Sequence, residues 1–404
     1  MSDPLVIIGN GMAAARFVEE LSTRALGRYA IAVIGDEPRL AYNRVLLSSV
    51  LAGEIESGDI ELKNSAWWRD RGVTLKYACA AREIDTTERV VRLANGERVP
   101  FAKLVIATGS SALRLNVPGS NLAGVHTFRD IRDVDILLGL ARDRKRVIVI
   151  GGGLLGLEAA YGLTKAGSKV TLLHLMDRLM ERQLDAAAAA VLKQRVEEKG
   201  VEVLLKASTA KILGDERVEG VELADGCTLA ADAVIFAAGI RPNAALAKEA
   251  GISVNRGIVV DDRMQTSVES VFALGECAEH RGVCYGLVEP AYEQARVLAE
   301  HLSDEKTLYG GSVVSTNLKV SGVSVFSAGD FEEKEGSETM TFRDLRRGIY
   351  KKLIVSGDRL TGAVLIGDTQ DALWYLDLIR TQKHIATMRH DLMFGRALAE
   401  PKAA

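Results

Sequence analysis

The sequence predicts an α/β protein in which two similar β–α–β units are followed by a small α+β domain. Two aliphatic strands, Leu5–Ile8 and Val147–Ile150, each run into a glycine-rich turn and then into a helical pattern. Neither strand alternates polar and apolar residues, which is typical of parallel strands that are covered on both faces. From about Tyr309 onward, antiparallel strand patterns replace the β–α alternation. Together these observations indicate the fold class.

The elements of the two units follow one another in the same order. In the first unit, a helix is predicted over Met12–Leu21 and a second strand over Ala30–Ile34. In the second unit, the corresponding elements are a helix over Leu154–Ala166 and a strand over Lys169–Leu173. The chain therefore carries the β–α–β pattern twice.

Both turns follow the pattern Gly-x-Gly-x-x-Gly or Ala. The residues at these positions are Gly9, Gly11 and Ala14 in the first turn, and Gly151, Gly153 and Gly156 in the second. The first glycine allows a tight bend, and the second lets the backbone approach a pyrophosphate. The small third residue lets the helix pack close to the strand, with the helix N-terminus facing the phosphates. A single match is weak, but two matches in strand–turn–helix context predict two Rossmann-like dinucleotide-binding domains.

Two later strands are predicted to end at small-residue turns, where a cofactor can lie close to the backbone, and a third strand is followed by a glycine and an acid. The pairs that follow these strands are Thr108–Gly109, Ala238–Gly239 and Gly275–Glu276. A helix is predicted to begin near Pro290, since proline suits the first turn of a helix. Beyond it, the C-terminal part is predicted to contain a hairpin with its turn around Ser356–Arg359 and then a helix.

Length and composition set broad limits on the function. The chain has 404 residues, 48% of them hydrophobic, and a net charge of -3, which suits two or three domains. A near-neutral balance gives no indication of nucleic acid or a membrane surface as partner. No apolar run reaches transmembrane length and a strand already starts at Leu5, so a cytoplasmic protein is expected. The cysteines match no common metal or iron–sulfur spacing, so no metal site is predicted: Cys79, Cys227, Cys277 and Cys284.

These features together resemble the FAD-dependent pyridine nucleotide-disulfide oxidoreductase superfamily over nearly the whole chain. Phrases such as "EPRLAYNRVLLSS", "GGGLLGLEAA", "LGECAEHRGVCYGLVEPAYEQA" and "STNLKVSGVSVFSAGD" are similar to one branch in particular. That branch comprises the flavin half of assimilatory NAD(P)H nitrite reductases and the FAD electron-transfer subunit of assimilatory nitrate reductases. The resemblance implies a discontinuous FAD-binding domain over 1–112 and 243–308, an inserted NAD(P)-binding domain over 113–242, and a C-terminal α+β domain over 309–404.

The resemblance also implies a function. Electrons from NADH or NADPH would pass through FAD to a redox protein, the catalytic subunit of a nitrate or nitrite reductase, because sirohaem and iron–sulfur modules are absent from the sequence. Two alternatives stay open: a ferredoxin or rubredoxin NAD(P)+ reductase of another pathway, and a non-catalytic NAD(P)H-sensing module. The two complete nucleotide turns argue against the sensor, which needs only one site.

Resemblance and glycine geometry agree on Gly9, Gly11 and Ala14 as contacts of the FAD pyrophosphate. The further residues expected at FAD are Asp36 or Glu37 at the ribose, Arg44 near the pyrophosphate, Ala81 at the adenine, and Thr108, Gly109, Gly275 and Glu276 along the remaining edge. A solvated surface arginine is the alternative for Arg44. The helix near Pro290 is expected to point its N-terminus at the flavin and to stabilise negative charge there.

The NAD(P) contacts are expected at Gly151, Gly153, Gly156, Ala238 and Gly239. His174 stands where an acid commonly bonds the ribose 2′-hydroxyl of NADH. Because His174 and the nearby Arg178 would not repel a 2′-phosphate, the choice between NADH and NADPH stays open. The alternative is that His174 only caps the end of its strand.

Two residues are candidates for a catalytic role, although the flavin itself supplies the chemistry. Glu158 is placed to contact the nicotinamide or the flavin, and the alternative is an ordinary acidic residue near a helix N-terminus. Lys319 matches a position close to the flavin in relatives, and a solvated sheet face fits it equally well.

Two differences from the sequences of related reductases limit the possible mechanisms of electron transfer. The stretch Leu40–Leu51 contains no cysteine, which argues against a dithiol relay. Ser49 stands where oxygenase-type ferredoxin reductases usually have lysine, so Glu158 lacks that partner.

Near the C-terminus a basic cluster is predicted either to dock an acidic ferredoxin-like protein or to be a solvated face: Arg343, Arg346, Arg347, Lys351 and Lys352.

Overall fold

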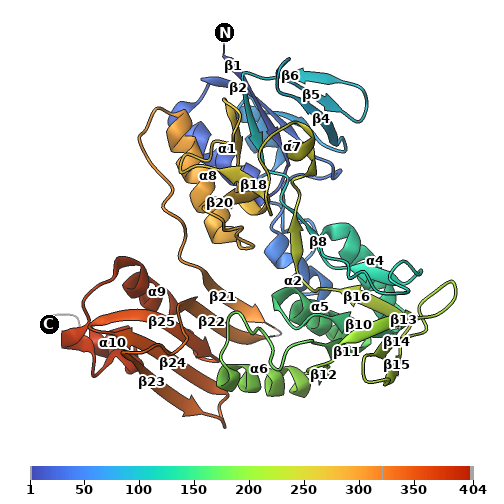
Figure 1. Cartoon of the computed structure of the whole chain (residues 1–404), viewed down its shortest axis with the longest axis vertical. Coiled ribbons are helices and arrows are strands. Elements are labelled where there is room, and N and C mark those ends of the chain that lie inside the picture. Colours follow the sequence, from blue (N-terminus) through green and yellow to red (C-terminus); the bar gives the residue numbers. More distant parts are fainter. Residues whose placement is uncertain (1, 321, 401–404) are drawn as a thin grey trace. The chain divides into compact units, whose positions relative to one another are not determined.

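The computed structural model describes residues 2–320 and 322–400 (Figure 1). The chain forms two compact units. Unit 1 combines Met1–Leu47, Ile55–Ser111 and Ile240–Ser312. Unit 2 combines Ser48–Glu54, Ala112–Gly239 and Val313–Ala404. Among the described residues, no helix is both long enough and apolar enough to cross a membrane.

Unit 1 contains a parallel sheet of aliphatic strands. In sheet order the strands are β19 (Val271–Ala273), β7 (Lys103–Ile106), β1 (Asp3–Ile8), β2 (Tyr29–Ile34) and β3 (Thr74–Lys76). The chain moves from β1 outward to β2 and β3, and then returns to the other side of β1 for β7 and β19. In open α/β sheets such a reversal leaves a crevice at the carboxyl ends of the strands, where ligands bind.

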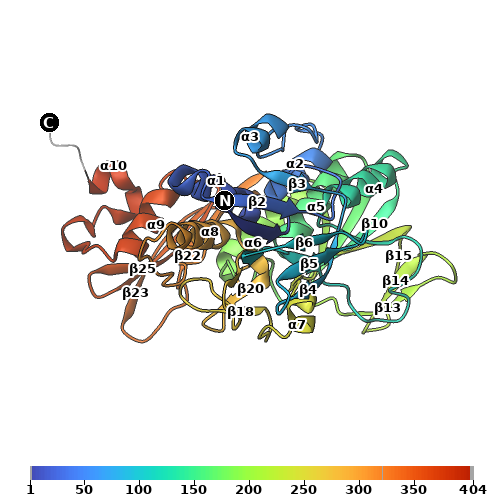
Figure 2. The ribbon, with the colours of Figure 1, turned by 90° about the horizontal axis from the view of Figure 1, so that it is seen from above.

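Helices cover this sheet. α1 (Met12–Ala25) contacts α8 (Val288–Leu302), and Figure 1 shows the two helices side by side. The buried side of α1 includes Ala14, Phe17, Val18 and Leu21, a spacing that forms one apolar helix face. The smaller elements of unit 1 are η1 (Arg44–Leu46), α3 (Ser65–Asp70), α7 (Ala245–Glu249), β18 (Ile258–Val260), η2 (Gly275–Cys277) and β20 (Ala278–His280). A separate antiparallel sheet consists of β4 (Ala81–Asp85), β5 (Val90–Leu93) and β6 (Arg98–Pro100) (Figure 2).

Unit 2 also contains a five-stranded parallel sheet. Its parallel sheet runs in the order β12 (Glu202–Leu204), β11 (Lys169–Leu173), β10 (Arg146–Ile150), β16 (Ala233–Phe236) and β9 (Val125–Thr127). The chain moves from β10 outward to β11 and β12 and then returns to the other side of β10 for β16, whereas the edge strand β9 comes before β10 in the sequence. The four strands from β12 to β16 are thus connected in the same order as β3, β2, β1 and β7 of unit 1. The helices are α2 (Leu47–Leu51), α4 (Ile131–Arg142), α5 (Leu154–Lys165) and α6 (Ala186–Glu198). An antiparallel sheet of β13 (Thr209–Leu213), β14 (Gly220–Leu223) and β15 (Thr228–Ala230) follows. A separate two-stranded sheet consists of β8 (Ser110–Ala112) and β17 (Ile240–Pro242).

The remainder of unit 2 is an antiparallel sheet with a helix. The strand order is β21 (Ser315–Val320), β22 (Val323–Gly329), β25 (Arg359–Ile366), β24 (Ile349–Ser356) and β23 (Ser337–Asp344). The last elements are α9 (Ala372–Thr381), η3 (Ala386–Met388), η4 (Leu392–Phe394) and α10 (Arg396–Ala399). Buried Phe326, Leu353 and Tyr375 join the sheet to α9 in one core. The hairpin around Ser356–Arg359 is as predicted, and the α/β fold class is confirmed. The domain boundaries inferred from resemblance stay a prediction.

Candidate functional site

The first glycine turn joins β1 to α1. Gly9 has φ +115°, and a Cβ there would lie 2.1 Å from the carbonyl oxygen of Ala107, so only glycine fits. Gly11 is different. It has φ −106°, which any residue can adopt, and an added Cβ would meet no atom within 4 Å. The fold itself therefore does not require glycine at this position.

The second turn, between β10 and α5, shows the same contrast. Gly151 has φ +127°, and a Cβ there would lie 2.3 Å from the Ala237 carbonyl oxygen. A Cβ on Gly156 would lie 1.8 Å from the Gly151 carbonyl oxygen, so the helix can approach the turn only without a side chain here. Gly153, with φ −83°, again faces open space. Each turn thus combines glycines that the fold needs with one that it does not.

Gly11 and Gly153 are also the N-cap residues of α1 and α5, and neither offers a side chain to the first backbone N–H groups. Such N–H groups carry partial positive charge and need acceptors. Open space at a helix N-terminus that no N-cap side chain covers suits a pyrophosphate that lies against the backbone. The two turns therefore fit the dinucleotides that the sequence predicts.

Several predicted FAD residues surround the first turn. Glu37 forms an ion pair with Arg44 and accepts a hydrogen bond of 2.7 Å from the Tyr42 hydroxyl. The Arg44 guanidinium also lies 4.9 Å from the centroid of the Tyr42 ring. Backbone bonds place the segment that contains Asp36 beside residues 78–79, shortly before Ala81 in β4. The structure thus groups these predicted residues in unit 1, with Glu37 and Arg44 paired to each other.

The ends of β7 and β19 are held together by polar contacts. The Ser110 hydroxyl donates a hydrogen bond of 2.8 Å to Glu276 Oε2, just after Thr108 and Gly109. The Gly275 N–H donates to Gln294 Oε1 at 2.8 Å, and Gln294 is buried in α8. α8 begins at Val288, so Pro290 lies in its first turn as predicted.

Asn243 and Gln294 were missed by sequence reasoning. Asn243 exchanges two bonds with Thr108: its Nδ2 donates to the Thr108 carbonyl at 2.9 Å, and its carbonyl accepts from the Thr108 hydroxyl at 2.7 Å. Gln294 could have been found, since it is a polar residue on the apolar face of α8 between Ala291 and Ala295. For Asn243 no local sequence signal exists, because its partner lies far along the chain.

Glu158 lies in α5, two residues after Gly156, and only 9% of it is exposed. Burial raises the pKa of Glu158 to about 7, although the Ser48 hydroxyl hydrogen-bonds to its carboxyl group and opposes this effect. Ser48 belongs to α2, which packs closely on α5: a Cβ on Gly162 would lie 2.9 Å from Leu51 Cγ. The residue beside Ser49 thus supplies the partner of Glu158.

Replacing Glu158 with glutamine is expected to change how stability depends on pH. The pKa of Glu158 is higher in the folded chain (about 7) than its usual 4.5, so the folded state favours the proton. The wild type should therefore lose up to about 3 kcal/mol of unfolding free energy as the pH rises from 4.5 through 7. E158Q should lack this loss. Denaturant titrations from pH 5 to 8 measure the unfolding free energy of both proteins. Glu202→Gln, at an exposed position, is the control and should keep the wild-type pH dependence. Parallel curves for wild type and E158Q would contradict the burial argument.

His174 follows β11 and is buried. Its Nδ1 accepts a hydrogen bond of 3.0 Å from the Gly152 N–H, and its Nε2 lies 3.1 Å from Glu181 Oε2. Arg178 bonds to the Asp177 carboxylate at 3.1 Å and to the Leu184 carbonyl at 3.3 Å. The structure thus places His174 directly behind the second glycine turn, with both ring nitrogens engaged.

The remaining predicted NAD(P) residues are Ala238 and Gly239. They follow β16, and the Ala238 nitrogen would lie 3.0 Å from a Cβ on Gly151, so this segment borders the second turn. Lys319 lies in β21, where its backbone pairs with Ser324, but its side chain lies outside the described residues.

The predicted basic docking cluster does not form one surface. Lys351 and Lys352 are buried in β24, an interior strand of its sheet. Lys351 pairs with Asp368 at 2.7 Å, and Lys352 lies 3.5 Å from Asp185 and 3.3 Å from Glu333. The interpretation as a single exposed cluster was wrong, because adjacent residues of a strand point to opposite faces of the sheet and both faces of β24 are covered here.

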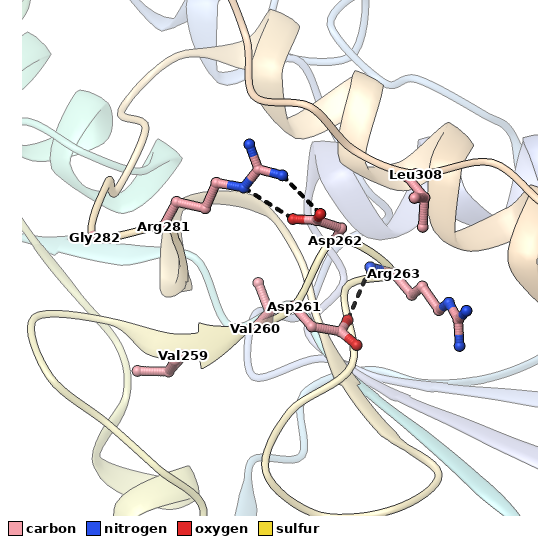
Figure 3. A pocket seen from close by; sticks show the side chains of 8 residues that line it. All are labelled: Val259, Val260, Asp261, Asp262, Arg263, Arg281, Gly282 and Leu308. Carbon is pink, nitrogen blue, oxygen red and sulfur yellow. Dashed lines mark hydrogen bonds and ion pairs between the residues drawn. The ribbon is translucent and has the colours of Figure 1, made fainter.

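A separate hollow of about 530 Å³ lies in unit 1, outside both turns (Figure 3). Its lining includes Asp262, which accepts hydrogen bonds from Arg281 at 2.7 and 3.0 Å and contacts His280 at 2.8 Å. The Arg281 guanidinium holds the pKa of Asp262 below its usual range. Because Asp262 is already paired with Arg281 and His280, the hollow is not a candidate catalytic centre.

Comparison with known proteins adds independent evidence. Residues 3–301 match the family described as pyridine nucleotide-disulphide oxidoreductase, and residues 315–383 match the rubredoxin NAD+ reductase C-terminal domain. The chain is 46% identical to a nitrite reductase [NAD(P)H] of Bacillus subtilis (strain 168), covering 95% of this chain and 48% of that protein. It is 41% identical to the assimilatory nitrate reductase electron transfer subunit of the same organism, covering 96% and 51%. It thus spans about half the length of these curated relatives.

A solved structure resembles most of the chain. The putidaredoxin reductase of a covalent complex with putidaredoxin superposes with a TM-score of 0.85 and 26% identity, covering 95% of this chain and 94% of that one. The paired glycine turns, the parallel sheets and the family match agree. The chain belongs to the pyridine nucleotide-disulphide oxidoreductase family and is an FAD- and NAD(P)H-dependent oxidoreductase.

Proposed function

We propose that this chain passes electrons from NAD(P)H through FAD to a redox protein that acts in nitrate or nitrite assimilation. The observation that carries the proposal is the open space over Gly11 and Gly153, one at each helix N-terminus. Two turns that leave room for a ligand at the backbone support two nucleotides in one chain. We assign the first turn to FAD, within a domain formed by residues 1–112 and 243–308, and the second to NAD(P)H, within residues 113–242.

Bound FAD would supply hydride acceptance and electron release, which no amino-acid side chain can supply. The N–H groups at the start of α1 would hold its pyrophosphate, with Arg44 nearby as a fixed cation. Ser110 orients Glu276, and Gln294 fixes the backbone of Gly275, so the edge of this site is held by α8 and β8.

At the second turn, Glu158 is the buried acid beside the nucleotide. Its raised pKa favours the protonated carboxyl group, which can donate a hydrogen bond and adds no negative charge. Ser48 fixes its orientation from α2. We therefore assign Glu158 to contact the nicotinamide or the flavin and Ser48 to position it.

The descriptions of two relatives support a role in nitrate or nitrite assimilation. One is a nitrite reductase [NAD(P)H] and another an assimilatory nitrate reductase electron transfer subunit, both above 40% identity. The absence of cysteine from Leu40–Leu51 supports direct electron release rather than a thiol relay.

A second candidate acceptor is a ferredoxin or rubredoxin. It is favoured by the match of residues 315–383 to a rubredoxin NAD+ reductase domain and by the end-to-end match to putidaredoxin reductase.

An acceptor screen tests the proposal. The FAD-loaded protein is mixed with NADH and with either a nitrate or nitrite reductase catalytic protein, a ferredoxin or a rubredoxin, and acceptor reduction is followed. We expect the fastest transfer to the nitrate or nitrite reductase protein. Exclusive transfer to ferredoxin or rubredoxin would establish the second candidate, and transfer to none would contradict both.

A further inference from the structure

His174 and Glu181, which both follow β11, form a pair behind the second glycine turn. A neutral imidazole has one nitrogen that accepts and one that donates. Nδ1 of His174 accepts from the Gly152 N–H, so Nε2 carries the hydrogen and donates it to Glu181 Oε2. The ring therefore has no nitrogen left to bind a phosphate group of a nucleotide.

The backbone around Glu181 is shaped to hold it there. The preceding residue, Met180, is fully buried and has φ +50°, a conformation that a non-glycine residue adopts at a cost. Its N–H donates to the Gly152 carbonyl at 3.0 Å. Gly152 is thus bonded on both sides, by His174 through its N–H and by Met180 through its carbonyl. A Cβ on Gly152 would lie 2.6 Å from His174 Cγ, so this packing depends on glycine.

We propose that Glu181, held by His174, selects NADH over NADPH at the second nucleotide site. Related dinucleotide sites use an acid at the end of the second strand to bind the ribose 2′-hydroxyl. Here a histidine follows the strand, and the acid comes from seven residues further along the chain. A carboxylate at this place accepts a hydrogen bond from a 2′-hydroxyl and repels a 2′-phosphate. The inference rests on the proposed function, because it assumes that NAD(P)H occupies the second turn.

The arginines near Glu181 do not cancel its repulsion of a 2′-phosphate. Arg178 is held by Asp177 and by the Leu184 carbonyl. Arg182 has no ion pair with any described residue, but its side chain is exposed, where a mobile charge is screened by water. Glu181 is 26% exposed in its side chain and is fixed by the buried His174. Its Oε1 makes no hydrogen bond within the described part of the chain, which leaves it available to a ribose hydroxyl.

Binding of two redox-inactive probes tests the proposal. ADP-ribose and 2′-phospho-ADP-ribose carry the adenosine half of NADH and NADPH without the nicotinamide, so calorimetry with the FAD-loaded protein measures binding without electron transfer. We expect the wild type to bind ADP-ribose at least about tenfold more tightly than the 2′-phosphorylated probe. Glu181→Gln keeps the size of the side chain and removes its charge, and should bring the ratio close to one. Glu202→Gln, the same change on β12 where Glu202 bonds to Thr171, should keep the wild-type ratio.

Each other outcome has a distinct meaning. An equal or tighter affinity of the wild type for the 2′-phosphorylated probe, or an unchanged ratio in E181Q, would overturn the role of Glu181. Binding of ADP-ribose with the expected preference but without flavin reduction by NADH would contradict the proposed function and leave the selection intact. Failure of both probes to bind would remove the second nucleotide site and both proposals with it.

Discussion

Gly153→Ala is expected to yield a folded, FAD-loaded protein whose flavin is reduced by NAD(P)H at least about 100-fold more slowly than in the wild type. The backbone at Gly153 has φ −83°, and its added Cβ meets no protein atom within 4 Å, so the fold should tolerate alanine. The methyl group would instead occupy the space in which the pyrophosphate of the nicotinamide nucleotide approaches the start of α5. Stopped-flow mixing without oxygen measures the rate of flavin reduction.

Gly139→Ala is the matched control for this variant. Gly139 lies inside α4 of the same unit and also faces open space. Alanine in a helix interior is neutral or stabilises by up to about 1 kcal/mol, and the reduction rate should be unchanged. A Gly153→Ala protein that is reduced as fast as the Gly139→Ala protein would show that no nucleotide approaches the second turn.

The corresponding change in the first turn, Gly11→Ala, should abolish FAD binding and leave a colourless protein. Gly11 has the same features as Gly153: an ordinary φ of −106° and open space at its Cβ position. Since a ligand that binds only the folded state stabilises it, loss of FAD should also lower stability by about 3 to 4 kcal/mol at FAD concentrations of about 100 to 1,000 times its dissociation constant. Flavin absorbance after purification and thermal unfolding with added FAD measure both effects.

Gly58→Ala serves as the control in unit 1, because Gly58 also faces open space but lies far along the chain from the turn. Gly9→Ala would not be informative, since φ +115° and a contact of 2.1 Å with Ala107 predict misfolding whether or not FAD binds. A yellow Gly11→Ala protein with the thermal stability of Gly58→Ala would contradict the assignment of the first turn.

The fold was largely predictable because its signals are local. The paired glycine turns and the aliphatic strands around them identify β1, α1, β10 and α5, and their predicted bounds differ from the observed ones by a few residues. The helix near Pro290 and the hairpin around Ser356–Arg359 also follow from short patterns. The burial of Lys351 and Lys352 was not predictable, because a run of basic residues does not show that both faces of their strand are covered.

The candidate site was only partly predictable, since several of the side chains that hold its residues in place come from distant parts of the sequence. Ser48 reaches Glu158 from a short helix more than a hundred residues earlier, and Asn243 bonds to Thr108 across a similar separation. His174 was recognised as a departure at the end of its strand. Its partner Glu181 could not be identified, because only the fold of the following turn brings the two side chains together.

The central claim is that one chain seats two nucleotides so that electrons pass from NAD(P)H to FAD. Anaerobic mixing of the FAD-loaded protein with NADH, followed by the visible absorbance of the oxidised flavin, tests it most directly. We expect the absorbance to disappear within seconds and to return when a competent acceptor protein is added. A flavin that stays oxidised with excess NADH and excess NADPH, although ADP-ribose binds, would contradict the account and indicate a nucleotide-binding module without turnover.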